Sequence, residues 1–298
     1  MEIKSLTKLN RKQIIRVNEL LTQCRQHEPV TIAPTMTSDS NYDPTIPCLY
    51  LLEESGFLMS YLSIYMPNPY YAECVAYTFP AARKRGNFMK LWMQALGELH
   101  DHPNVNLDEM EIMFLTDGKS PDALATLKAL RMKYQYTEYV LTKKLMSEPP
   151  LPPTDLSFNL LDAKSDGDAN AIYMLHESMF AEGEAASRVF VESCKQDYVQ
   201  NYLVRAAEED NRPVGMFHLA LDGDRVFLFG FGVLPDYQGK GYAQKMINLA
   251  LSEVPDGILT MGLQVSSYNE AAYNLYIKAG FSESSRLDYY YDDFETDF

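Results

Sequence analysis

The sequence contains few cysteines, and the four present, Cys24, Cys48, Cys74 and Cys194, lie far apart. None of them forms a CxxC pair, so the spacing predicts neither a disulfide framework nor a zinc site, and we expect no metal. No segment approaches the roughly 20 uncharged apolar residues that cross a membrane. The first residues also lack the basic and then apolar layout of a signal peptide, so we expect a cytoplasmic protein with no membrane partner.

Positive charge is also scarce, and it is distributed unevenly. The net charge of −15 argues against a nucleic-acid partner, which needs a basic surface. Residues 1–150 contain 16 Lys and Arg against 17 Asp and Glu, whereas residues 151–298 contain 10 against 24. An acidic surface can simply keep a protein soluble. It can also attract a cationic acceptor, a small molecule or a peptide, and the composition leaves both interpretations open.

A proline-rich segment divides the chain. The whole chain has 298 residues, of which 46% are apolar and 22% charged. This is the composition of a globular protein, and the length is enough for two domains. Residues 147–155 (SEPPLPPTD) contain four prolines, which continue neither a helix nor a sheet ladder. We therefore expect one domain at residues 1–146, a stiff linker at 147–157 and a second domain at 158–298.

The two halves have the same order of predicted elements. Apolar periodicity in the first half predicts helices at 9–24 and 87–99 and strands at 48–52, 56–66, 72–79 and 110–115. In the second half it predicts helices at 169–179, 242–251 and 270–279 and strands at 201–206, 213–221, 225–233 and 258–265. Pro80, Arg83 and Gly86 recur 155 positions later as Pro235, Gln238 and Gly241, with Gln in place of Arg. This offset indicates a tandem repeat of one fold.

The segment 233–243 (VLPDYQGKGYA) is the strongest candidate for chemistry. An apolar strand ends at Pro235, and a glycine-rich turn leads into a helix. Glycines let the backbone approach an anion closely, and the positive end of a helix suits a pyrophosphate. Two glycines alone are more typical of an ordinary turn between a strand and a helix. The segment lacks the third glycine of a dinucleotide fingerprint and the Gly-Lys-Ser/Thr of a Walker A loop.

Two motifs together resemble the GNAT superfamily of N-acetyltransferases. Residues 238–243 (QGKGYA) match its Q/R-x-x-G-x-G/A signature, and residues 269–281 (NEAAYNLYIKAGF) resemble its N-x-x-A-x-x-L-Y-x-x-x-G-F helix and turn. Asn269 follows Gly241 by 28 positions, which leaves room for one helix and one strand between the motifs. The resemblance covers about residues 158–291.

The resemblance implies an α/β fold of two tandem GNAT-like domains, each a mixed and largely antiparallel sheet flanked by helices. It also implies an acyl-CoA-dependent N-acyltransferase, with acetyl-CoA as co-substrate, that transfers the acyl group directly to a primary amine in a ternary complex. Tyr276 is the implied acid for the leaving thiolate, which a neutral phenol can protonate. The residues implied to bind the cofactor are Phe231, Gly232, Val233, Leu234, Gln238, Gly239, Lys240, Gly241, Tyr242, Ala243, Asn269 and Tyr276. The alternative is a non-catalytic CoA-binding or regulatory module.

The first half matches the family less completely. Phe88 stands where the signature has Gly or Ala, and Lys133 stands where the later turn has Gly. Ala129 falls where the second half has Tyr276. We therefore expect a degenerate copy without a working acid, although the three basic residues at 83–85 can still attract phosphates.

The sequence offers several candidates for the general base that accepts the proton of the amine. Residues 227–232, in the strand that leads into the glycine-rich turn, contain no ionisable side chain, but His218 lies on the neighbouring strand and Glu73 on the matching strand of the first half. A lone strand histidine is more often a packing residue. Asp288, Asp292 and Asp293 can instead line an acceptor pocket.

Overall fold

The computed structural model describes residues 1–145 and 155–291, and these form two compact units. Unit 1 comprises residues 1–138 and the chain from Ser285 onward, and unit 2 comprises Tyr139–Ser284. These bounds differ from the expected 1–146 and 158–298 because two strands, β6 (Lys133–Lys144) and β12 (Ser282–Tyr291), each contribute to both units. Of the expected linker at 147–157 only residues 155–157 are described, and Asp292 and Asp293 lie outside the described residues.

Unit 1 is built on a mixed sheet with the strand order β1-β2-β3-β4-β5-β12-β6. Its further strands are β1 (Glu2–Leu6), β2 (Leu49–Glu54), β3 (Phe57–Asn68), β4 (Tyr71–Thr78) and β5 (Glu111–Thr116). Strands β1 to β4 are antiparallel neighbours, β5 runs parallel to β4, and β12 is antiparallel to β5. The helices are α1 (Arg11–His27), α2 (Asn87–His100) and α3 (Pro121–Ala129), with a short 3-10 turn η1 (Pro80–Ala82) before α2.

Unit 2 repeats this plan with the strand order β7-β8-β9-β10-β11-β6-β12. Its strands are β7 (Leu156–Leu161), β8 (Val199–Ala206), β9 (Arg212–Asp222), β10 (Arg225–Val233) and β11 (Thr260–Ser266). Its helices are α4 (Asp166–Phe180), α5 (Glu184–Cys194), α6 (Tyr242–Ser252) and α7 (Glu270–Lys278), with 3-10 turns η2 (Ala207–Glu209) and η3 (Pro235–Tyr237). Three of these elements, α5, β7 and β12, are absent from the prediction; the run Val189-Phe190-Val191 in α5 has the composition of a strand.

The same opening occurs between the two parallel strands of each unit. In unit 1 the pairing of β4 with β5 runs from Tyr71 to Cys74, and in unit 2 the pairing of β10 with β11 covers only Arg225–Phe227. Both β4 and β10 continue past the last paired residue and lead through a 3-10 turn into a helix. The expected α/β fold of two tandem GNAT-like domains is confirmed, because the two units share element order, strand direction and this opening.

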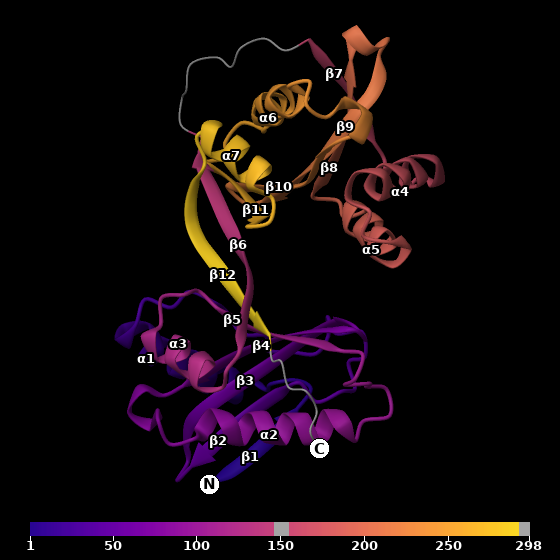
Figure 1. Ribbon diagram of the computed structural model, residues 1–298. Helices are drawn as coiled ribbons and strands as arrows, with labels where there is room; N and C mark the ends of the chain where they lie inside the picture. Colours follow the sequence, from indigo (N-terminus) through magenta and orange to yellow (C-terminus); the bar gives the residue numbers. More distant parts are fainter. Residues whose placement is uncertain (146–154, 292–298) are drawn as a thin grey trace. The chain divides into compact units, whose positions relative to one another are not determined.

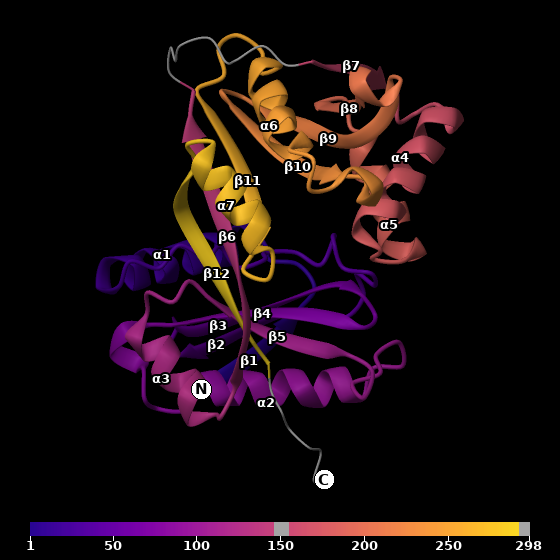
Figure 2. The ribbon, with the colours of Figure 1, turned by 45° about the horizontal axis from the view of Figure 1, so that its top comes forward.

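Two apolar layers cover the two faces of the unit 2 sheet. Met246 and Ile247 of α6 pack with Phe217 and Leu219 of β9 on one face, and α4 and α5 cover Met216 on the other face. Figures 1 and 2 show α6 and the α4–α5 pair on opposite sides of strands β8 to β10. The alternation along β9 fixes which side chains face which helices, and it places His218 on the α5 side. Among the described residues, no helix is long and apolar enough to cross a membrane.

Candidate active site

The glycine-rich turn of unit 2 presents an open helix N-terminus. Gly239 and Gly241 have φ values of 75° and 83°, in the left-handed region that a glycine adopts without strain. Gly241 is the N-cap of α6, and no side chain of the described residues caps this helix. The first N–H groups of α6 are therefore available to an anion, at the positive end of the helix dipole. The expected phosphate-binding residues 238–243 form this turn.

The side chains around this turn have partners of their own. Gln238 Nε2 donates to Val233 O at 3.1 Å, so this residue ties the turn to the end of β10. Lys240 Nζ lies 2.8 Å from Glu209 Oε1, and Lys245 Nζ lies 2.9 Å from Asp155 Oδ2. These are largely exposed ion pairs of small stability, so an incoming phosphate can replace the carboxylates.

The remaining residues that were expected to bind the cofactor differ in whether they are already hydrogen-bonded or buried. Leu234 N already donates to Val214 O at 2.9 Å, and Asn269 caps α7 by accepting from Ala272 N at 3.0 Å. Tyr242 and Val233 are buried in the core of unit 2. Phe231 and Gly232 differ from these, because they lie in the part of β10 that is beyond its pairing with β11.

A bulge interrupts β10 at this point. Phe229 pairs with His218 and Gly232 pairs with Met216, so one extra residue is inserted on β10 between the two pairs. A Cβ on Gly232 would lie 2.9 Å from Met179 Sδ and 3.1 Å from Phe180 Cζ, so a larger residue here would displace these side chains. Residues 230–231 have a single residue of β9 opposite them, so the regular register of the two strands is interrupted there.

Tyr276 and Phe231 are brought together as expected. Tyr276 lies on α7 with 6% of its surface exposed, and its ring packs edge-on against Phe231 and Phe281, each at a centroid distance of 5.9 Å. Burial raises the pKa of Tyr276 above its ordinary value. The phenol is therefore protonated at neutral pH.

The candidates for the general base lie in different surroundings. Glu73 belongs to unit 1, where Tyr71 Oη donates to its Oε1 at 3.2 Å and burial raises its pKa. Asp288, also in unit 1, accepts from Thr137 Oγ1 at 2.7 Å and pairs with Arg286 at 3.0 Å, so it is already engaged. His218 is buried in unit 2 beneath α5.

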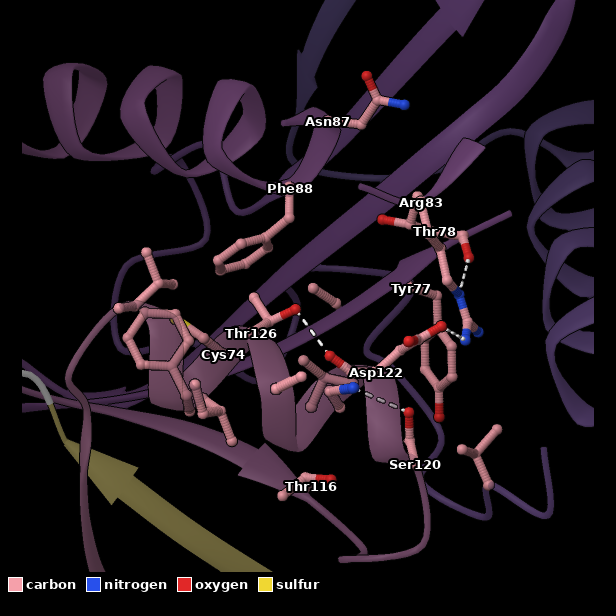
Figure 3. Close-up of a pocket in the computed structure, with 18 of the residues that line it drawn as sticks. Cys74, Tyr77, Thr78, Arg83, Asn87, Phe88, Thr116, Ser120, Asp122 and Thr126 are labelled. Atoms are coloured by element: carbon pink, nitrogen blue, oxygen red, sulfur yellow. Dashed lines mark hydrogen bonds and ion pairs between the residues drawn. The ribbon is translucent and has the colours of Figure 1, made fainter. Parts of the chain in front are cut away.

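Unit 1 has a cavity beside the turn that corresponds to the glycine-rich turn of unit 2. The cavity has a volume of about 430 Å³ and is formed by the ends of β4 and β5, the start of α2, and α3. Figure 3 shows Phe88 and Thr126 reaching into it, with Tyr77 and Arg83 at one side. Gly86, at φ 71°, is the N-cap of α2 and corresponds to Gly241. The unit 1 copy has therefore kept the opening between its strands.

Arg83, the residue of unit 1 that corresponds to Gln238, forms ion pairs with two carboxylates. Arg83 Nη1 lies 2.8 Å from Glu28 Oε2 and 3.0 Å from Asp122 Oδ2, and the side chains of Arg83 and Glu28 are mostly buried. Glu28 also accepts from Ser120 Oγ at 2.8 Å. A pyrophosphate would have to compete with two carboxylates for Arg83, so of the three basic residues at 83–85 this one is already engaged.

The helix register corrects one expected correspondence. Arg131 has φ 60° and follows α3 as Gly280, with φ 90°, follows α7. Met132 N donates to Leu127 O at 3.0 Å, and Phe281 N donates to Tyr276 O at 3.0 Å. Leu127 and Arg131, rather than Ala129 and Lys133, are therefore the counterparts of Tyr276 and Gly280. The expected residues, Ala129 and Lys133, each lie two positions after the residues that the bonds closing α3 and α7 make equivalent.

Comparisons with known proteins agree with this geometry. Residues 169–281 match the acetyltransferase (GNAT) family. A stretch of 98 residues is 31% identical to the [ribosomal protein bS18]-alanine N-acetyltransferase of Haemophilus influenzae, and it covers 32% of this chain and 66% of that protein. Among solved structures, a GCN5-related N-acetyltransferase from Sphaerobacter thermophilus has a TM-score of 0.75 at 15% identity, covering 97% of this chain and 94% of that one. A tandem GNAT protein from the clavulanic acid biosynthesis pathway has a TM-score of 0.65 at 14% identity, covering 97% of both chains.

Proposed function

The chain belongs to the acetyltransferase (GNAT) family, and on that premise we propose that unit 2 is an acyl-CoA-dependent N-acyltransferase that uses acetyl-CoA. The observation that carries this proposal is the open N-terminus of α6 behind Gly241, in the same unit as the Tyr276–Phe231 contact at the open end of β10. The first feature suits the pyrophosphate of CoA, and the second places a proton donor where a thiolate would leave.

The reaction proposed here is a direct transfer. The amine nitrogen forms a bond to the carbonyl carbon of the thioester, and the carbon–sulfur bond breaks. Tyr276 Oη gives its proton to the departing sulfur and regains one from solvent, and the amine loses its proton to solvent or to a base. Backbone N–H groups at the bulge, residues 230–231, would stabilise the developing negative charge on the carbonyl oxygen. The phosphates would lie against residues 238–243.

A covalent acyl-enzyme has little support in unit 2. Cys194 is buried, and burial raises its pKa to about 12, so its thiolate is scarce at neutral pH. All four cysteines are free and buried, which suits the reducing cytoplasm that we propose as the location. Unit 1 fits the alternative function, a non-catalytic module, because Leu127 replaces the acid and Arg83 is already paired.

The acceptor is proposed to be a primary amine, with a cationic molecule favoured by the acidic second half of the chain. The Haemophilus influenzae relative is named for an alanine of a ribosomal protein, so a peptide with N-terminal alanine is a reasonable member of the panel. The test is CoA release from acetyl-CoA with spermidine, lysine, an aminoglycoside and this peptide. Release with at least one amine, reduced in Tyr276→Phe, is the expected result. No release with any amine, together with no acetyl-CoA binding by calorimetry, would overturn the proposal.

A further inference from the structure

His218 is a buried histidine of unit 2 whose ring is fixed by Asn201. His218 Nδ1 lies 2.7 Å from Asn201 Oδ1, and His218 is only 1% exposed. The amide nitrogen of Asn201 donates to Leu161 O at 3.3 Å and to Cys194 O at 3.1 Å. Since both partners of that nitrogen are carbonyl oxygens, the amide has one orientation, and its oxygen faces the ring.

This network determines the tautomer of His218. An amide oxygen only accepts hydrogen bonds, so Nδ1 must carry the proton. In a neutral imidazole the other nitrogen, Nε2, then has a free lone pair. Among the described residues Nε2 has no hydrogen-bond partner, although it is buried. Native proteins retain few such acceptors, and each one calls for a physical explanation.

The free edge of the ring faces the bulge of β10. A Cβ on Gly230 would lie 2.7 Å from His218 Cδ2, the atom bonded to Nε2. Gly230 has φ 54° and is followed by Phe231, whose ring contacts Tyr276. The same Cβ would lie 2.4 Å from Phe190 Cζ, so the Phe190 ring packs against Gly230 beside this edge. The lone pair therefore lies beside the backbone segment that the proposed reaction uses.

The charge state of His218 limits its role. Burial, with a smaller contribution from His176, lowers the pKa of His218 to about 3. The ring stays uncharged at neutral pH, so Nε2 accepts a hydrogen bond but does not take up a second proton. Cys194 Sγ lies 3.7 Å from Nδ1, the protonated nitrogen, so this Cys–His–Asn group is not arranged to deprotonate the thiol.

We infer that His218 binds the acceptor of unit 2: its Nε2 accepts a hydrogen bond from an N–H of the amine and orients that nitrogen beside the bulge at Gly230. The inference rests on the proposed function and adds a selectivity to it. The lone pair of an uncharged ring forms a hydrogen bond with an amine that carries an N–H. It forms none with a cation that lacks an N–H. Phe190 of α5 lies over this ring, 5.2 Å away between centroids, and also stacks on His176 at 4.1 Å. Its side chain must move to admit the amine.

Two variants separate binding from structure. His218→Asn places an amide nitrogen near the position of Nδ1, so it keeps the hydrogen bond to Asn201 and loses the lone pair of Nε2. His218→Gln places an amide oxygen near the position of Nε2, so it keeps an acceptor and loses the bond to Asn201. With the amine that releases most CoA, we expect the KM for the amine to rise about tenfold in His218→Asn, with acetyl-CoA affinity and melting temperature unchanged. His218→Gln should melt lower but keep a KM closer to that of the parent.

A readout without turnover keeps this test separate from the proposed function. In the full chain labelled with ¹⁵N-histidine, the Nε2 resonance of His218 should shift when ethylamine is added. Tetramethylammonium, a cation without an N–H, should leave it in place. A parent-like KM in His218→Asn with a raised KM in His218→Gln would show a purely structural histidine. An unchanged resonance with ethylamine would overturn the inference equally, even if acetyl transfer is observed.

Discussion

Arg83 Nε donates to Thr78 O at 3.2 Å, and this bond has a counterpart 155 positions later, where Gln238 Nε2 donates to Val233 O at 3.1 Å. Both residues stand at the first position of the glycine-rich signature. In each unit the bond ties the turn to the end of the strand before it. The choice of Arg or Gln at this position is therefore explained by a shared donor that reaches a strand carbonyl, and this position does not need to contact phosphate.

The Gln238 bond predicts a specific pair of phenotypes. Gln238→Ala frees the turn from β10, so the N–H groups of α6 are less well placed, and we expect acetyl-CoA affinity to fall about tenfold. Gln238→Arg restores the donor in the form that unit 1 uses and should bind nearly as tightly as the parent. Calorimetry with CoA measures both. An equal loss of CoA affinity in the two variants would show that the hydrogen bond from residue 238 to Val233 O does not determine CoA binding.

Arg83 has a second role that Gln238 lacks, because it neutralises Glu28. Arg83→Met leaves a mostly buried carboxylate without its cation, and we expect the free energy of unfolding to fall by ~3 kcal/mol. The double variant Arg83→Met with Glu28→Gln removes the unpaired charge and should recover most of the loss. Urea unfolding measures both variants. A double variant as unstable as the single one would contradict this explanation.

Glu73 predicts how stability depends on pH. Burial raises its pKa, so over the range between its ordinary and its raised pKa the folded state holds more protons than the unfolded state. The free energy of unfolding therefore falls as the pH rises through this range. Glu73→Gln removes the ionisation while keeping an acceptor for Tyr71, so it should melt higher than the parent at pH 7 and equally at about pH 4. Glu111→Gln, at an exposed strand position, is the control for the substitution itself.

Much of the fold and part of the site followed from local sequence. Periodicity and the 155-residue offset predicted the repeated order of elements, and the glycine motif predicted the turn before α6. The division of β6 between the units did not follow, because a strand pattern does not say which sheet a strand joins. Residues 139–144 belong to unit 2 although they precede the proline-rich segment.

The parts of the site that sequence missed depend on contacts between distant residues. His218 was visible only as a lone strand histidine, since its tautomer is set by Asn201, 17 positions away in sequence. The neutralisation of Arg83 by Glu28 joins residues 55 positions apart. The counterpart of Tyr276 was misplaced by two positions, because the loose resemblance of residues 125–134 to the motif did not determine the helix register, which the bonds from Met132 N to Leu127 O and from Phe281 N to Tyr276 O define.

The role of the α6 N-terminus is tested by a charge at Gly241. Both Gly241→Ala and Gly241→Glu force a side chain into φ 83°, and a Cβ there meets nothing within 4 Å, so the two variants share the same backbone strain. They differ in the negative charge that glutamate brings to the proposed pyrophosphate site. We expect CoA affinity to be about tenfold lower in Gly241→Glu than in Gly241→Ala. If calorimetry gives the same affinity for both, the phosphates bind elsewhere.

Tyr276→Phe tests the proposed acid. The phenyl ring keeps the edge contacts with Phe231 and Phe281, and only one buried hydroxyl is removed, so folding and CoA binding should persist. The proton is needed when the thiolate leaves, so the loss should fall on the chemical step, with kcat reduced about a hundredfold and CoA affinity unchanged. Tyr273→Phe removes a hydroxyl from the same helix that is bonded to Glu283, and it should leave kcat near the parent value. Single-turnover kinetics identifies the chemical step. A Tyr276→Phe enzyme whose chemical step is as fast as that of the parent would show that the thiolate leaves without this acid, and solvent would then be its proton source.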